Sequence, residues 1–167
     1  PAARFDLKKI CFEGPEETLA QTEYTQPCMV AFAAGVTAVL KEAGIVPAAA
    51  AGLSLGEYSA LCAAGAMAPE AAVELAAFRG RLMAETVHGR ACAMAAVLGL
   101  ERSVLQAVLA MVEKEAGVVE IANYNCPGQM VIGGDTPAVE KACGLALEAG
   151  AKACRPLKVS GPFHTSL

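Results

Sequence analysis

The chain has 167 residues, an apolar content of 55% and a net charge of −4, enough for one domain or two small ones and too apolar for a disordered protein. The negative charge, without a cluster of Lys and Arg, argues against nucleic-acid binding. A clean run of about 18 apolar residues is missing, so the sequence predicts no membrane-spanning helix. No basic segment followed by an apolar one opens the chain, which argues against a secretory signal.

Seven cysteines and two histidines limit the redox and metal chemistry that the sequence predicts. The cysteines are odd in number and form no CxxC motif, so we expect neither a zinc cluster nor a disulfide framework. Buried, reduced cysteines are typical of a cytoplasmic protein, and we expect that location. Much of the apolar content comes from 36 alanines, which favour a core of closely packed helices.

The sequence opens with a polar stretch that is followed by one clear helix. Residues 1–19 contain several turn formers, so we expect an irregular segment there. Pro27 suits a first helical turn and Gly44 follows the end of the periodic pattern, so these residues bound a predicted helix. Its apolar face consists of Met29, Phe32, Ala33, Val36 and Leu40.

A strand and two helices are expected next. The small residues 48–51 follow Pro47 and predict a short buried strand. Residues 52–56 (Gly-Leu-Ser-Leu-Gly) come directly after it. Helices are predicted from Glu57 and from Pro69.

Residues 92–160 predict a small βαββαβ unit. Strands are expected over 94–100, 118–124, 129–132 and 153–159, and helices over 103–116 and 136–149. Ser103 and Gln106 have the spacing of a capping box, and Thr136-Pro137 predicts the cap of the second helix. The order of these elements is the ferredoxin-like signature.

The strongest candidate for chemistry is Ser54, at the centre of Gly-Leu-Ser-Leu-Gly. In a nucleophile elbow such a serine occupies a strained turn between a strand and a helix, and the flanking glycines are expected because the turn leaves no room for a Cβ atom. The start of the next helix would favour an oxyanion, with the Leu55 N–H as its donor. The alternative is a glycine-rich connection with a passive serine.

A serine nucleophile needs a base, and the chain offers His88 and His164. His88 lies in a polar stretch that is typical of a solvated helix end. His164 lies in a Gly-Pro loop after a predicted strand, a usual position for a catalytic residue, so we predict His164 as the base. The alternative is an ordinary loop histidine. The two aspartates, Asp6 and Asp135, are poorly placed to complete a Ser-Asp-His triad.

Four ordered segments carry a resemblance to a known family. They are 52–61 (GLSLGEYSAL), 78–83 (FRGRLM), 122–132 (ANYNCPGQMVI) and 159–164 (VSGPFH). The opening segments 5–17 (FDLKKICFEGPEE) and 25–27 (Thr-Gln-Pro) fit the same pattern. Over essentially its whole length the chain resembles the malonyl-CoA:acyl-carrier-protein transacylases of the acyltransferase domain family.

The resemblance implies a role for each candidate residue. Ser54 matches the acyl-accepting serine, His164 matches its base, and Arg79 matches the arginine that binds the free carboxylate of malonate. A planar guanidinium fork suits that carboxylate. Without the resemblance, Arg79 would be interpreted as a solvated helix residue, as Arg81 still is. Asn125 matches a recurrent asparagine near the active-site cleft, and the alternative for it is a turn former.

The activity implied is ping-pong acyl transfer in fatty acid biosynthesis. Malonyl-CoA would load Ser54, and the phosphopantetheine thiol of acyl carrier protein would then accept the malonyl group. Malonyl-CoA and acyl carrier protein are the expected partners, with no metal, nucleotide cofactor, nucleic acid or membrane. We expect the complete protein to be a monomer.

The expected fold is α/β in three parts. Residues 1–91 would form a partial α/β-hydrolase-like subdomain with the nucleophile elbow, and residues 92–160 the ferredoxin-like subdomain. A return segment over 161–167 would carry the catalytic histidine.

Two departures from the family's pattern leave alternatives open. Leu53 stands where the family commonly has histidine. The family also begins with a strand and a Gly-Gln-Gly-x-Gln loop that this chain lacks, and it continues past the histidine, so we expect a piece lacking both ends. One alternative is an inactive truncated chain of poor solubility. The other is a serine esterase or thioesterase of the α/β-hydrolase class, which the scarcity of Asp opposes.

Overall fold

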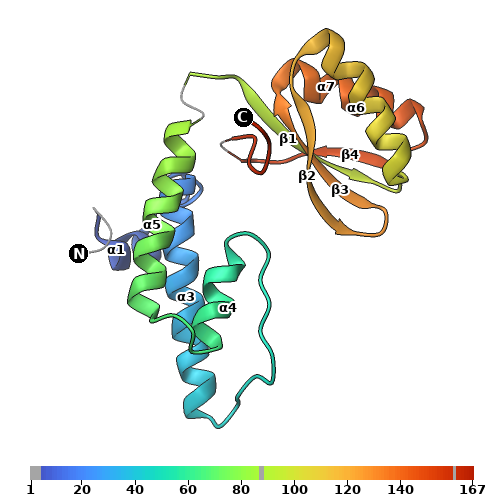
Figure 1. The fold of residues 1–167 in the computed structure, drawn as a ribbon. Coiled ribbons are helices and arrows are strands. Elements are labelled where there is room, and N and C mark those ends of the chain that lie inside the picture. The colour runs from blue at the N-terminus through green and yellow to red at the C-terminus, as the bar shows by residue number, and fades with distance from the viewer. Residues whose placement is uncertain (1–4, 87–88, 160) are drawn as a thin grey trace. The chain divides into compact units, whose positions relative to one another are not determined.

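The computed structural model describes residues 5–86, 89–159 and 161–167 of a mixed α/β protein (Figure 1). The chain divides into two compact units, Pro1–Ala84 and Glu85–Leu167. Helices make up the first unit, and the second contains a sheet. None of the helices in the described ranges is long and apolar enough to cross a membrane.

Helices form early in the first unit, where α1 begins two residues after the first described residue. Its helices are α1 (Leu7–Glu13), α2 (Glu16–Leu19), α3 (Thr22–Glu42), α4 (Gly56–Ala63) and α5 (Pro69–Thr86). The Asp6 side chain caps α1 by accepting from the Lys9 N–H at 3.0 Å, and Glu16 and Glu17 occupy the first turn of α2, where a helix favours negative charge. The expectation of an irregular opening is therefore wrong.

Helix α3 begins at Thr22, five residues before the predicted start, and Pro27 lies inside it. The Thr25 hydroxyl shares its single proton between the carbonyls of Leu19 and Gln21, which ties the preceding turn to the helix. The buried residues of α3 are Gln26, Pro27, Cys28 and Val30. The predicted apolar face is largely exposed, as at Phe32 with 67% of its surface accessible. Val30 instead packs against α4 and α5 in the small apolar core of this unit.

The connection between α3 and α4 contains no strand, so the prediction of a strand over 48–51 is wrong. A strand is stabilised by pairing with a neighbour, and the described part of the first unit offers none. Helix α5 begins at Pro69 as predicted, and α4 begins at Gly56, one residue before the predicted Glu57.

The second unit contains a four-stranded sheet and two helices. Its elements are β1 (Cys92–Leu98), α6 (Arg102–Ala116), β2 (Val119–Cys126), β3 (Gln129–Asp135), α7 (Thr136–Glu148) and β4 (Ala153–Pro156). The strands lie in the order β2-β3-β1-β4, and each neighbouring pair is antiparallel. Helices α6 and α7 pack beside each other against the sheet (Figure 1).

The two predicted helix caps of the second unit are wrong. The residue before α6 is Glu101 and its side chain makes no cap bond, so Ser103 lies inside the first turn. Asp135 rather than Thr136 precedes α7, and its carboxylate is used elsewhere. It accepts from the Arg90 guanidinium at 2.8 and 3.0 Å and from the Val118 N–H at 2.9 Å. The hydrogen bond from Arg90 is the main reason that the pKa of Asp135 is lowered.

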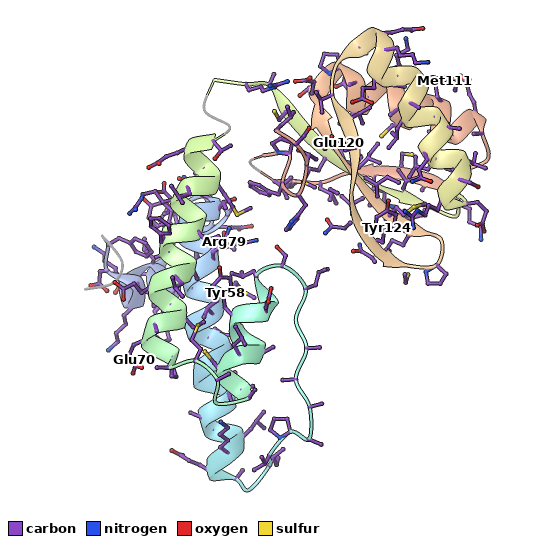
Figure 2. The ribbon with its side chains drawn as sticks, viewed as in Figure 1. Tyr58, Glu70, Arg79, Met111, Glu120 and Tyr124 are labelled. Atoms are coloured by element: carbon purple, nitrogen blue, oxygen red, sulfur yellow. The ribbon has the colours of Figure 1, made fainter. Side chains whose placement is uncertain are left out.

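Leu105 of α6 is completely buried in the core of the second unit. Leu105→Ala is expected to lower the free energy of unfolding by about 2–5 kcal/mol, because it leaves a cavity between helix and sheet. Met111 lies on the same helix with 55% of its surface exposed (Figure 2), and Met111→Ala should change that free energy by less than about 0.5 kcal/mol. Urea denaturation of both variants measures the difference, and equal effects would contradict this account of the core.

Candidate active site

Ser54 occupies a tight turn immediately before α4. Its φ is 53°, in the left-handed region that residues other than glycine rarely adopt. The Gly56 N–H donates to the Leu53 carbonyl at 2.9 Å and the Glu57 N–H to the Ser54 carbonyl at 3.3 Å, so the turn leads directly into the helix. This strained geometry agrees with the elbow pattern and places the hydroxyl at the positive end of α4.

The two glycines of the elbow have different roles. A Cβ atom on Gly52 would lie 2.0 Å from the carbonyl carbon of Gly56, so only glycine fits at the first position. A Cβ on Gly56 would meet nothing within 4 Å. The steric reason that the sequence pattern suggested for both glycines therefore applies to Gly52 and is wrong for Gly56.

The Leu55 N–H is available at this turn. Within the described ranges it donates to no backbone carbonyl, whereas the next three N–H groups along the chain all do. A backbone donor next to the serine, at a helix start, is suitably placed for an oxyanion on an acyl group carried by that serine.

Arg79 projects from α5 (Figure 2), and its side chain contacts Ser54. Its Nη2 donates to Ser54 Oγ at 2.8 Å, and its Nη1 donates to the amide oxygen of Gln26 at 2.6 Å. The nearby Arg81 guanidinium instead lies 5.4 Å from the centre of the Phe78 ring. The structure therefore brings Arg79 to the serine, as the carboxylate-binding hypothesis requires.

Gln26 is the residue of this site that sequence reasoning missed. It is buried in α3, with 6% of its surface exposed, and joins Arg79 across 53 residues of sequence. Its only sequence signal is the Thr-Gln-Pro segment, which contributed to the family resemblance without suggesting a role.

His164 belongs to the second unit, whereas Ser54 and Arg79 belong to the first. It is exposed and has a φ of 62°, a conformation in which histidine is enriched among non-glycine residues. The Thr165 hydroxyl donates to the Pro162 carbonyl at 2.6 Å, and the Ser166 N–H donates to the Glu120 carboxylate of β2 at 2.6 Å. The first bond closes the turn that carries His164, and the second attaches the following residues to β2. The other candidate base, His88, lies outside the described residues.

Asn125 lies in β2 rather than in the turn that follows. The pairing of β2 with β3 is irregular between Tyr124 and Cys126, so Asn125 occupies a bulge. Its side chain is exposed, and its amide nitrogen donates to Gln129 Oε1 at 3.3 Å. The alternative of a turn former is thus wrong, since residues 127–128 make the turn.

Burial makes most of the cysteines poor nucleophiles. All seven thiols are free. Burial raises the pKa of Cys28 and of Cys143 to about 12, and it raises the pKa values of Cys62, Cys92 and Cys154 above their ordinary value. Because the thiolate is the reactive form, these five residues are weak nucleophiles at neutral pH.

Comparison with known proteins identifies the family. The family model for the acyl transferase domain matches residues 1–161. The chain belongs to the acyl transferase domain family.

The names of relatives that this chain matches describe malonyl transfer. It is 47% identical to the malonyl CoA-acyl carrier protein transacylase of Bacillus subtilis (strain 168) over 161 residues, covering 96% of this chain and 51% of that protein. The structure matches an acyl-carrier-protein S-malonyltransferase from Burkholderia pseudomallei 1710b with a TM-score of 0.90 and 43% identity, over 99% of this chain and 54% of that one.

A third relative is a solved complex of a type II PKS acyl-carrier protein with its malonyl-transacylase. It matches with a TM-score of 0.88 and 40% identity, over 95% of this chain and 51% of that one. The chain thus spans about half the length of the relatives it matches.

Proposed function

We propose that the complete protein transfers a malonyl group from malonyl-CoA to the phosphopantetheine thiol of acyl carrier protein, through a malonyl ester of Ser54, in fatty acid biosynthesis. The contact between Arg79 and the Ser54 hydroxyl, 2.8 Å long, carries the proposal. In a malonyl ester, one carbonyl carbon and one methylene separate the serine oxygen from the free carboxylate. A guanidinium at the serine is therefore within reach of that carboxylate, and five N–H donors leave room for it.

The proposed chemistry has two balanced half-reactions. His164 removes the Ser54 proton as the hydroxyl oxygen attacks the thioester carbonyl, and the Leu55 N–H binds the oxyanion that forms. The intermediate collapses, the carbon–sulfur bond breaks, and the CoA thiolate takes the proton from His164. The phosphopantetheine thiol then attacks the malonyl ester in the same way and releases Ser54. No metal or nucleotide cofactor takes part in this proposal.

The strand order of the second unit and the turn at Ser54 support two subdomains. The antiparallel order β2-β3-β1-β4 supports a ferredoxin-like subdomain over 92–160, and the turn at Ser54 supports a hydrolase-like subdomain over 1–91. Residues 161–167 would form the return segment with the histidine. The exposed amide of Asn125 supports a substrate contact. We also propose a cytoplasmic monomer, as expected of an enzyme of this kind without disulfides.

Mass spectrometry of the complete protein after incubation with malonyl-CoA tests the function. The peptide that contains Ser54 should gain the mass of one malonyl group, and Ser54→Ala should abolish this gain. Added acyl carrier protein carrying phosphopantetheine should then remove the group and acquire it. Rapid release of free malonate would instead identify a thioesterase, and the absence of any adduct would contradict the proposal.

A further inference from the structure

Gln26 is a buried polar residue that binds the guanidinium of Arg79. Its amide oxygen accepts from Arg79 Nη1 at 2.6 Å, while Arg79 Nη2 donates to Ser54 Oγ at 2.8 Å. One guanidinium therefore joins α3 and α5 to the turn before α4. Because a guanidinium is planar and rigid, fixing Nη1 on Gln26 also fixes where Nη2 points.

The orientation of the Gln26 amide is determined by its two partners. Arginine only donates hydrogen bonds, so the amide oxygen must face Arg79. The amide nitrogen faces the other way and donates to the Met83 sulfur at 3.3 Å. Met83 and Arg79 lie one turn apart on α5, so one helix holds both ends of the amide. Gln26 is thereby prevented from turning its NH₂ group toward the arginine.

A neutral acceptor at this position has an electrostatic consequence. A carboxylate would also accept from Nη1, but it would form an ion pair and offset the charge of the guanidinium at a partly buried position, where such pairing is stronger than in water. The Gln26 amide holds the arginine without cancelling its charge. The positive charge beside Ser54 remains available for an anionic group.

We propose that Gln26 is the positioning residue that sets acyl-group specificity, by holding Arg79 against Ser54 while leaving its charge for the free carboxylate of the acyl group. This inference rests on the proposed malonyl transfer. The contact that Gln26 makes is with Arg79, so we expect it to act through the arginine. It favours acyl groups that end in a carboxylate over neutral acyl groups of similar size.

The test compares malonyl-CoA with acetyl-CoA as donors for loading of Ser54 in the complete protein. Gln26→Glu should lower the ratio of kcat/KM for malonyl to that for acetyl by about 10–100-fold, because the new carboxylate pairs with Arg79. Most of this change should be a rise in KM for malonyl-CoA. Gln26→Met removes the acceptor without adding charge and should lower the ratio by less, since Arg79 keeps its charge and loses its support.

The control is Gln21→Glu, which adds the same charge at an exposed position just before α3. This variant should leave the ratio unchanged. An unchanged malonyl-to-acetyl ratio of kcat/KM in Gln26→Glu, or equal losses for both donors, would overturn the inference. If the Glu variant does not fold, the same ratio measured for Gln26→Met decides the question. Loading of the unaltered protein is read in the same assay. Its failure would reject the malonyl transfer itself, whereas normal loading with unaffected variants would reject only the role of Gln26.

Discussion

Replacing Arg79 with alanine is expected to lower malonyl loading of Ser54 by about 10²–10³-fold, while acetyl loading falls by less than about tenfold. The guanidinium lies 2.8 Å from the Ser54 hydroxyl, where it would make charge-assisted hydrogen bonds to the malonyl carboxylate. An acetyl group has no such carboxylate. The rate of acetyl loading should therefore fall only by the effect that the arginine has on the serine itself. Initial rates of ester formation with the two CoA donors give the comparison.

Two further variants test whether the planar guanidinium of Arg79 is needed, and whether any nearby guanidinium would have the same effect. Arg79→Lys keeps the charge but loses the planar fork, so malonyl loading should recover only in part. Arg81→Ala removes a guanidinium two residues away that lies over the Phe78 ring, and both loading rates should stay close to those of the unaltered protein. If Arg79→Ala reduced malonyl and acetyl loading equally, the carboxylate-binding role would be rejected.

Gly52→Ala should strongly lower the rate of loading with either donor, although it adds a single methyl group. That methyl would lie 2.0 Å from the Gly56 carbonyl carbon, so the start of α4 must move and take the Leu55 N–H with it. Overpacking of this kind costs about 1–3 kcal/mol of stability, and the displaced oxyanion donor should cost about 10²–10³-fold in rate. Thermal unfolding and the loading assay measure the two effects.

Gly56→Ala is the matched control within the same motif. Its added Cβ meets nothing within 4 Å, and alanine is favoured over glycine in a helix. We expect unchanged or slightly higher stability and loading within a few-fold of the unaltered protein. Comparable losses in both variants would show that the motif needs glycine at both positions and that steric room at Gly52 is not the cause.

Local features of this chain could be predicted from the sequence. The apolar spacing in α6 predicts one buried face, because the helical period alone selects it. Of the residues on that face, Leu105, Val108, Leu109 and Val112 are buried, whereas Val104 at the edge of the stripe is exposed. The turn at Ser54 could be predicted for a similar reason, since the motif that marks it spans only five residues and Gly52 is sterically required there.

Features that depend on distant residues could not be predicted. A strand over 48–51 needs a neighbouring strand, and small residues beside a proline do not reveal whether one exists. The periodicity of α3 identified an apolar face but not which elements cover it, and Phe32 is exposed as a result. Gln26 belongs to the site because of Arg79, which lies 53 residues away in sequence.

The left-handed backbone at Ser54 has a consequence for how this family can change. A glycine would adopt a φ of 53° without the penalty that a serine meets there, which is of order 1 kcal/mol. Mutation toward greater stability therefore favours loss of the very hydroxyl that we propose as the nucleophile.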